Sequence, residues 1–461
     1  MSKAGLRAAT EKMRAAEVSE AAIEVFAHYY AQLESGATGL IPEESIAPLV
    51  DLPHLADIHP DDAAAHDAMA QTVVIKLNGG LGTSMGMDRA KSLLPVRDDG
   101  RTFLDLIVDQ VRYARRRYNA RLPLVLMNSF RTSRDSLDAL AAHPDIVVDG
   151  LPLEFVQSQE PKLTVADLMP ATWPADPSLE WCPPGHGDFY PSILASGLLD
   201  ALIAAGFHYA LVSNSDNLGA TPDGRLAAWF AASGAPYAAE VSPRTPADRK
   251  GGHLARRRTD DQLILRDTAQ TAPDDLVHFM DETRHPYVHT NTLWLDLVAL
   301  RRELSGRGPV LGLPLIRNAK TVDPTDPDSP AVYQIESAIG AAIEVFHGAA
   351  AILVGRDRFL PVKTTNDLLV LRSDAYTVGE DAVPRLAAAR AALVDLDPRF
   401  YRTMSGFDAR FPTGAPSLRS ATSLTVHGDW RFGADVVVRG EAELADPGTP
   451  QTLADGTTIG T

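Results

Sequence analysis

The sequence predicts an α/β protein with a mixed, mostly parallel sheet flanked by helices. Three observations lead to this fold class: short β-branched apolar runs alternate with amphipathic stretches, a glycine-rich segment follows the first run, and polar motifs follow later ones. Such alternation builds parallel sheets, which bind ligands at the carboxyl ends of their strands. The expected strands are 72–77, 122–129, 153–157 and 208–214, and the expected helices are 102–118, 132–143 and 189–205.

The segments around this alternation have other patterns. Residues 18–34 carry apolar side chains at helical spacing and predict an amphipathic helix. A second helix is expected at 332–347, and a strand is expected within 350–363. Three apolar runs with short connections predict an antiparallel portion, at 236–243, 262–269 and 287–295.

Apolar residues recur every six positions near the C-terminus, at Val426, Phe432, Val438 and Leu444. A period of six favours the coils of a short left-handed β-helix, although two hairpins would also fit four positions. Three domains are expected on this basis. They are an N-terminal helical segment at 1–70, the sheet domain at 71–410 and a β-helix-like domain at 411–461.

The composition excludes several classes of protein. The 461 residues include 43 lysines and arginines against 60 aspartates and glutamates, for a net charge of −17, so a basic face for nucleic acid is not expected. The single cysteine, Cys182, permits no internal disulfide and no cysteine-rich zinc site, which favours a reducing, cytoplasmic location. The charged N-terminus predicts no signal peptide, and no apolar run reaches the length of about 18 residues that a membrane span requires.

Lysine is scarce, with eight residues against 35 arginines. This skew is typical of arginine replacing lysine wherever either residue serves. Each internal lysine is therefore a candidate for a position where arginine will not do. The internal lysines in motif-bearing segments are Lys76, Lys91, Lys162, Lys320 and Lys363.

The expected strand at 72–77 runs into a loop, 78–86, that contains four glycines. The backbone N–H groups of such a loop can turn inward around an anion. The spacing fits neither the Walker loop nor the dinucleotide fingerprint, which disfavours a P-loop NTPase and an NAD-dependent dehydrogenase. Lys91 follows nine residues after Gly82, on a flexible stem suited to a polyphosphate. A tight turn beside a surface lysine is the alternative.

The stretch KLNGGLGTSMG-x4-KS-x-LPV resembles closely the nucleotide loop of eukaryotic-type UTP–glucose-1-phosphate uridylyltransferases, or UDP-glucose pyrophosphorylases. The resemblance implies a nucleotidyltransferase-type, Rossmann-like sheet and a lysine, here Lys91, that contacts the phosphates. The segment MDRA at 87–90 departs from the family pattern. The residues implied to hold the nucleotide are Leu77, Asn78, Gly79 and Gly80.

Two further motifs follow expected strands. The sequence VQSQ resembles the family segment whose glutamine reads the uracil base; Gln157 aligns best and Gln159 is the alternative. An amide offers both a donor and an acceptor, as a uracil edge requires. The sequence WCPPGHGD resembles the loop in which a glycine, here Gly185, contacts uracil and a histidine, here His186, contacts the substrate.

The sequence SNSDNLG follows the expected strand at 208–214. Asp216 matches the metal-binding aspartate of the family and is expected to hold Mg²⁺, which needs only one or two carboxylates beside phosphate oxygens. An Asx turn that closes the strand is the alternative. Asn214 is expected to contact the nucleotide.

The sugar site is implied by two shorter matches. The sequence HTNTLW resembles the family's sugar-binding N-T-N-N-x-W; Asn291 is retained, whereas His289 and Thr292 depart from it. The sequence QIES resembles Q-L-E-T, and its Glu336 is an acceptor suited to sugar hydroxyls.

The sequence FLPVKTTNDL resembles a family block whose lysine, here Lys363, reaches the reacting phosphates. Together the matches predict uridylyl transfer from UTP to glucose 1-phosphate, giving UDP-glucose and diphosphate. The sugar phosphate is already ionised at neutral pH, so direct in-line displacement needs no general base. Lys91, Lys363 and Mg²⁺ on Asp216 are expected to stabilise charge on the phosphates.

Two alternatives stay open. A broader UDP-sugar pyrophosphorylase would share the loop and the lysines and differ at the sugar. A non-catalytic nucleotide-sugar-binding regulator would not require Lys91, Asp216 and Lys363 together. The expected partners are the substrates and products alone, without nucleic acid or membrane, and the family's C-terminal β-helix leaves a homo-oligomer open.

Overall fold

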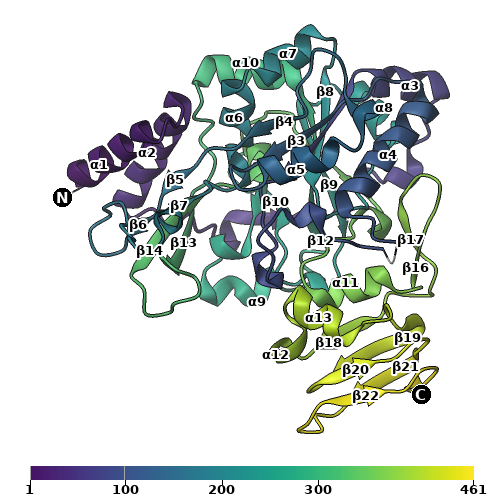
Figure 1. Ribbon diagram of the computed structural model, residues 1–461. Coiled ribbons are helices and arrows are strands. Elements are labelled where there is room, and N and C mark those ends of the chain that lie inside the picture. Colours follow the sequence, from purple (N-terminus) through teal and green to yellow (C-terminus); the bar gives the residue numbers. More distant parts are fainter. Residues whose placement is uncertain (1, 98) are drawn as a thin grey trace.

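The computed structural model of the chain describes residues 2–97 and 99–461. At its centre lies a sheet whose seven described strands are covered by helices on both faces (Figure 1). Within this sheet β12 is antiparallel to both of its neighbours and the other pairings are parallel, which confirms the mixed, mostly parallel sheet. In sheet order the strands are β15 (Ala350–Leu353), β9 (Tyr237–Pro243), β12 (Tyr287–Asp296), β8 (Tyr209–Asn214), β2 (Thr72–Asn78), β3 (Leu124–Asn128) and β4 (Glu154–Val156).

Strand β2 shows why the sheet needs cover on both sides. Val74 belongs to one hydrophobic core, and its neighbours Val73 and Ile75 belong to the other, since successive side chains of a strand point to opposite faces. The first core is completed by α3 (Asp62–Ala70), α4 (Phe103–Tyr118), α8 (Gly224–Ser233) and α11 (Thr365–Arg372). The second core is completed by α1 (Ser2–Ala15), α2 (Glu20–Glu34), α6 (Phe189–Ala195), α7 (Leu198–Ala204) and α10 (Leu297–Arg307).

Most expected helices are present with small shifts. The helix expected at 18–34 is α2, which Ser19 caps by accepting from the Ala22 amide. The helices expected at 102–118 and 132–143 are α4 and α5 (Ser133–Leu140). The helix expected at 189–205 is divided into α6 and α7, because Gly197 has a φ of 75° and interrupts the helical turn.

The helix expected at 332–347 is wrong. Residues Ala331–Glu336 form strand β14, which pairs with β13 (Ile316–Thr321) and β6 (Leu163–Thr164), and a 3₁₀ helix follows at Ile339–Glu344. Val332 and Ile335 are spaced by three, as in a helix, but they are buried in two separate clusters. Pairing with strands distant in sequence therefore overrides the local spacing.

Smaller sheets surround the central one. The antiparallel portion expected between 235 and 300 is confirmed by the pairing of β9 with β12 and of β10 (His253–Arg257) with β11 (Leu263–Arg266). No described helix is both long and apolar enough to cross a membrane. The remaining elements here are β1 (Ile46–Pro48), β5 (Glu160–Pro161), β7 (Trp181–Cys182), α9 (Leu276–Phe279), β16 (Tyr376–Val378) and β17 (Pro384–Leu386).

The C-terminal residues form two parallel sheets, drawn in yellow and yellow-green in Figure 1. Val426, Phe432 and Val438 are buried among these strands, as the period of six requires, whereas the fourth position, Leu444, is half-buried. Every pairing between the described strands of these two sheets is parallel, which excludes hairpins between them. One sheet holds β18 (Leu393–Leu396), β19 (Ser417–Val426), β21 (Val437–Leu444) and β23 (Thr458–Ile459), and the other holds β20 (Trp430–Phe432) and β22 (Gln451–Leu453). The helices α12 (Pro398–Tyr401) and α13 (Met404–Arg410) lie between β18 and β19 in the chain.

Candidate active site

The carboxyl ends of β2 and β8 mark the point where the chain changes direction across the sheet. From β2 the chain adds β3 and β4 on one side, and it then returns to place β8 on the other side. Such a switch point opens a crevice at the carboxyl edge. The loops that carry the sequence motifs begin at this edge.

The glycine loop lies directly on the predicted base-reading glutamine. A Cβ atom added to Gly79 would lie 2.5 Å from Nε2 of Gln157, so the end of the Gln157 side chain would have to move to admit it, whereas Gly80 faces open space. The loop closes on itself through a hydrogen bond from the Lys91 amide to the Gly80 carbonyl, 3.2 Å. The structure therefore brings the predicted glycines, the glutamine and Lys91 together.

Asn78 has a different position from the one its motif implies. Its side chain is buried, and its Nδ2 donates to Oδ1 of Asn128 at 2.7 Å and to Oγ of Ser136 at 2.8 Å. The amide thus ties β2 to β3 and α5 instead of facing the loop. Leu77 is half-buried at the end of the same strand, and its carbonyl accepts from the Ser215 amide at 3.1 Å.

An ion pair joins two of the predicted catalytic groups. The ammonium of Lys91 lies 2.6 Å from Oδ2 of Asp216, and the two side chains are 17% and 20% exposed. Asp216 does not close an Asx turn with this oxygen. The neighbouring Asn217 does so instead, because its Oδ1 accepts from the Gly219 amide.

Lys363 reaches the same place from another part of the chain. The amide of Val362 donates to the carbonyl of Asp216 at 3.4 Å, so Lys363 follows immediately beside the loop. Its own amide donates to the carboxylate of Asp367 at 2.8 Å, as part of the N-terminal capping of α11. The Lys363 side chain is exposed, and it forms no ion pair with any residue that the structure describes.

The histidine of the PPGHGD motif has a defined tautomer. Its Nδ1 accepts from the Ile339 amide at 2.8 Å, so the ring proton of neutral His186 is on Nε2. Desolvation by the surrounding loops lowers the pKa of His186 to about 4, although the residue keeps an exposed surface. Gly185 has a φ of 77° and would bring a Cβ within 2.6 Å of the Ser337 carbonyl. These contacts hold the motif against Glu336, which ends β14.

The predicted nucleotide and sugar groups meet at Asn214 and Asn291. Nδ2 of Asn291 donates to Oδ1 of Asn214 at 2.9 Å. Asn291 has a φ of 55° at a bulge in β12, a strained conformation that turns its side chain toward β8. The two departures, His289 and Thr292, are both buried beside it, and desolvation lowers the pKa of His289 to about 3.

Two buried acids near the motifs were not predicted from the sequence. The carboxylate of Asp188 accepts from the Ser158 amide and from Oγ of Ser192, each at 2.6 Å, and desolvation raises its pKa to about 6. Burial, and then the nearby Asp188, raises the pKa of Glu160 well above its usual range. Asp188 is the last residue of the PPGHGD motif, and this position is the sequence signal that could have identified it. Its hydrogen bond from the Ser158 amide joins that motif to the segment after Gln157.

Comparison with known proteins identifies the family to which the chain belongs. The sequence profile described as UTP--glucose-1-phosphate uridylyltransferase matches residues 23–439. The chain belongs to the UTP–glucose-1-phosphate uridylyltransferase family.

Several family members are similar over nearly the whole chain. The UTP–glucose-1-phosphate uridylyltransferase of Solanum tuberosum is 37% identical over 426 residues, which cover 91% of this chain and 84% of the potato protein. The enzyme of the same name from Saccharomyces cerevisiae is 39% identical over 377 residues, covering 81% of this chain and 73% of the yeast protein.

Solved structures agree with this membership. A mutant of UDP-glucose pyrophosphorylase from Leishmania major in complex with UDP-glucose has a TM-score of 0.91 at 40% identity, covering 99% of this chain and 98% of that chain. A structure named UDP-glucose phosphorylase, from Trypanosoma brucei, has a TM-score of 0.91 at 41% identity, with the same coverage. The resemblance and the enzyme class predicted from the motifs are confirmed.

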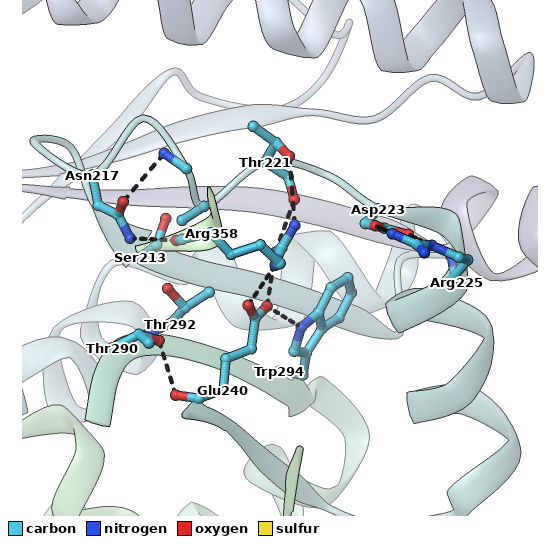
Figure 2. A network of polar contacts seen from close by, with 12 residues as sticks. Ser213, Asn217, Thr221, Asp223, Arg225, Glu240, Thr290, Thr292, Trp294 and Arg358 are labelled. Atoms are coloured by element: carbon cyan, nitrogen blue, oxygen red, sulfur yellow. Dashed lines mark hydrogen bonds and ion pairs between the residues drawn. The ribbon is translucent and has the colours of Figure 1, made fainter. Parts of the chain in front are cut away.

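This uridylyltransferase also contains a buried polar network behind its site loops, shown in Figure 2. Arg358 and Glu240 form a two-pronged ion pair, with Nε to Oε2 at 2.6 Å and Nη2 to Oε1 at 2.9 Å. Desolvation, and then the Arg358 charge, lowers the pKa of the buried Lys76 nearby to about 7. A charged residue within the apolar strand sequence YAAEVSP is the signal that could have identified Glu240.

Proposed function

We propose that the chain transfers the uridylyl group of UTP to glucose 1-phosphate, giving UDP-glucose and diphosphate by direct in-line displacement. The observation that carries this proposal is the cluster of Lys91, Asp216 and Lys363 beside the glycine loop. Lys91 pairs with Asp216, and the backbone that leads into Lys363 contacts the Asp216 loop at the carboxyl edge of the sheet. That arrangement suits two polyanionic substrates, whose reaction depends on positioning and charge neutralisation.

The base and the sugar are assigned to different residues around the crevice. Gln157 lies against Gly79 and offers an amide to the uracil edge, with Gly185 as a backbone contact. Nε2–H of His186 is a donor for a phosphate or sugar hydroxyl, since Nδ1 is already occupied. Asn291 and Glu336 are assigned to the glucose hydroxyls.

Asp216 is the proposed ligand for Mg²⁺. The described residues contain no group of three or more His, Cys, Asp or Glu side chains that could enclose a metal. A single, partly exposed carboxylate fits Mg²⁺, which binds through one or two carboxylates and completes its coordination with phosphate oxygens and water. Bound there, Mg²⁺ supplies positive charge to the phosphate oxygens.

The lysines have separate proposed roles in the displacement. Lys363 stabilises charge at the α-phosphorus and on the incoming sugar phosphate. Lys91 stabilises the leaving diphosphate, for which it must release Asp216. The attacking phosphate oxygen is ionised at neutral pH, so these side chains need to hold and orient the substrates but not to remove a proton.

A broader UDP-sugar pyrophosphorylase is the second candidate, favoured by the buried His289 and Thr292 beside Asn291. The deciding experiment supplies UTP and Mg²⁺ with a panel of sugar 1-phosphates and follows diphosphate release. We expect glucose 1-phosphate to give the highest kcat/KM by at least about 10-fold, a discrimination of about 1.4 kcal/mol. Comparable kcat/KM values across the panel would establish the broader enzyme, and UDP-glucose binding without diphosphate release would establish a regulator.

The proposal also covers the domain organisation, the cellular location and the oligomeric state. Residues 1–70, 71–410 and 411–461 are proposed as the three domains, with β18 of the second domain pairing with β19 of the third. The parallel C-terminal sheets support a short β-helix whose coils are left-handed. The buried, unpaired thiol of Cys182 is in keeping with a cytoplasmic location. A homo-oligomer through the C-terminal strands is tested by light scattering.

A further inference from the structure

The segment 213–221, which comprises the last two residues of β8 and the loop that follows, carries Asp216 and is fixed from below by a buried lysine. Nζ of Lys76 donates to Oγ of Ser213 at 2.8 Å and to the carbonyl of Ala220 at 2.9 Å. One ammonium thus holds the two ends of the loop, whose centre carries Asp216. Lys76 is 1% exposed and reaches the loop from the central strand β2.

A second segment, residues 357–363, lies on this loop and leads into Lys363. Asn217 joins the two: its Nδ2 donates to the Arg358 carbonyl at 3.1 Å, and its Oδ1 accepts from the Leu360 amide at 2.9 Å. A Cβ on Gly219 would lie 2.5 Å from the Asp357 carbonyl, so the two backbones are in contact. The positions of Asp216 and Lys363 therefore depend on one packed unit.

The Glu240–Arg358 ion pair attaches this unit to the sheet. Glu240 belongs to β9, is 0% exposed, and accepts from both Arg358 and Nε1 of Trp294, the latter at 3.0 Å (Figure 2). The guanidinium also donates from Nη2 to the Thr221 carbonyl at 3.2 Å. Arg358 thus contacts the end of the first loop while its own backbone begins the second.

The chemistry of the Glu240–Arg358 pair favours a role in orienting the two segments over a role in stabilising the fold. Burying two charges costs about as much as their attraction returns, and apolar replacements of such pairs are often neutral. The planar fork of arginine, held by both carboxylate oxygens, fixes an orientation that lysine or an apolar side chain does not reproduce.

We propose that Glu240 and Arg358 are positioning residues, which set the Lys363 segment relative to the Asp216 loop for the transfer step. Neither needs to touch substrate. The proposal rests on the roles proposed above for Asp216 and Lys363. If the role proposed for Lys363 is wrong, Lys363→Ala will show near-normal turnover. That result is distinct from the results that would contradict the positioning proposal.

The test uses a variant that removes both charges, Glu240→Gln with Arg358→Met, so that no single buried charge is left unpaired and Trp294 keeps an acceptor. We expect kcat to fall about 10- to 100-fold while KM for UTP changes less than about threefold, because displacing a catalytic group by about 1 Å has this effect. The matched control is Asp223→Asn with Arg225→Met. The side chains of this neighbouring pair lie 2.7 Å apart and, among the described residues, form no hydrogen bond with either loop, so kcat should stay within about twofold.

A mutant cycle separates positioning from a general structural role. When the Glu240/Arg358 change is combined with Lys363→Ala, kcat should equal that of Lys363→Ala alone, since the pair acts through that lysine. A multiplicative loss, or wild-type kcat in the charge-free variant, would overturn the proposal. If that variant does not fold, Arg358→Lys keeps the charge and loses the fork; we expect a native melting temperature with reduced kcat, and wild-type kcat there also overturns it.

Discussion

The ammonium of Lys91 donates a 2.6 Å hydrogen bond to Oδ2 of Asp216, across 125 residues of sequence. The two groups were assigned separate tasks from separate motifs, yet the fold places them in one ion pair. In the free protein the lysine therefore occupies an oxygen that the proposed metal requires. Binding of a divalent cation and release of Lys91 toward the phosphates are expected to be coupled.

Replacing Lys91 with methionine should tighten the binding of Mn²⁺, used as a probe, to the nucleotide-free protein. A largely shielded pair of this kind contributes up to about 1 kcal/mol, so removing the competitor should lower the Kd up to about fivefold. Electron paramagnetic resonance titration measures free Mn²⁺ directly. Lys363→Met is the control, because its ammonium does not bond Asp216; equal Mn²⁺ affinity in both variants would contradict competition by Lys91.

Replacing Lys363 with alanine should lower kcat by about 10²- to 10³-fold, the usual effect of removing one group that stabilises charge in the transition state. The side chain is exposed, so the fold should be unaffected. Steady-state kinetics and a thermal melt of the same sample check both statements. Near-normal turnover would show that Lys363 has no role in the chemistry.

Asp216 and Asn217 are adjacent and should respond in opposite ways to alanine substitution. Asp216→Ala should remove activity and weaken metal dependence while stability changes by less than about 1 kcal/mol, because its ion pair is partly exposed. Asn217→Ala should cost about 2–5 kcal/mol, since it leaves buried groups of Arg358 and Leu360 without partners. Urea unfolding and Mg²⁺ titration of both variants test this contrast; a destabilised Asp216→Ala would restore the Asx-turn interpretation.

The sequence was sufficient wherever a local pattern had one physical solution. The apolar run of β2 could only be a buried strand, and the glycines after it left room for Gln157 at Gly79. Local patterning failed at 332–347, where helical spacing and strand pairing both fitted the residues. Only the presence of β13 and β6 decided for a strand.

Contacts between distant segments lay beyond sequence reasoning for a different reason. The motifs gave Lys91 and Asp216 their chemistry but not their mutual distance, which depends on how the two loops fold over the sheet. The Nδ1 contact of His186 depends likewise on an amide 153 residues away. Glu240 and Arg358 belong to none of the sequence motifs, and only the ion pair that they form in the fold indicates a role for them.

A stacked histidine pair away from the site predicts acid sensitivity. The rings of His253 and His285 lie 3.8 Å apart between centroids, and both are buried. Nε2 of His285 contacts Oε1 of Glu43 at 3.2 Å, while Nε2 of His253 and Nδ1 of His285 have no hydrogen-bond partner among the residues that the structure describes. Desolvation holds the pKa of both histidines below 6.5, most strongly for His253. The nearby cations Arg244, Arg266 and Arg284 lower these pKa values further, whereas Glu43 raises that of His285.

Stability should therefore fall as the pH drops below about 6.5. The unfolded chain takes up protons there that the folded chain excludes, at a cost of up to about 1.4 kcal/mol per pH unit for each histidine. Above pH 6.5 both states keep these rings neutral, and they contribute no slope. His253→Phe preserves the stack on His285 and removes one titrating group, so its urea-unfolding free energy should decline less steeply between pH 6.5 and 5 than that of the unaltered protein. Equal slopes would mean that the pair is already protonated in the folded state.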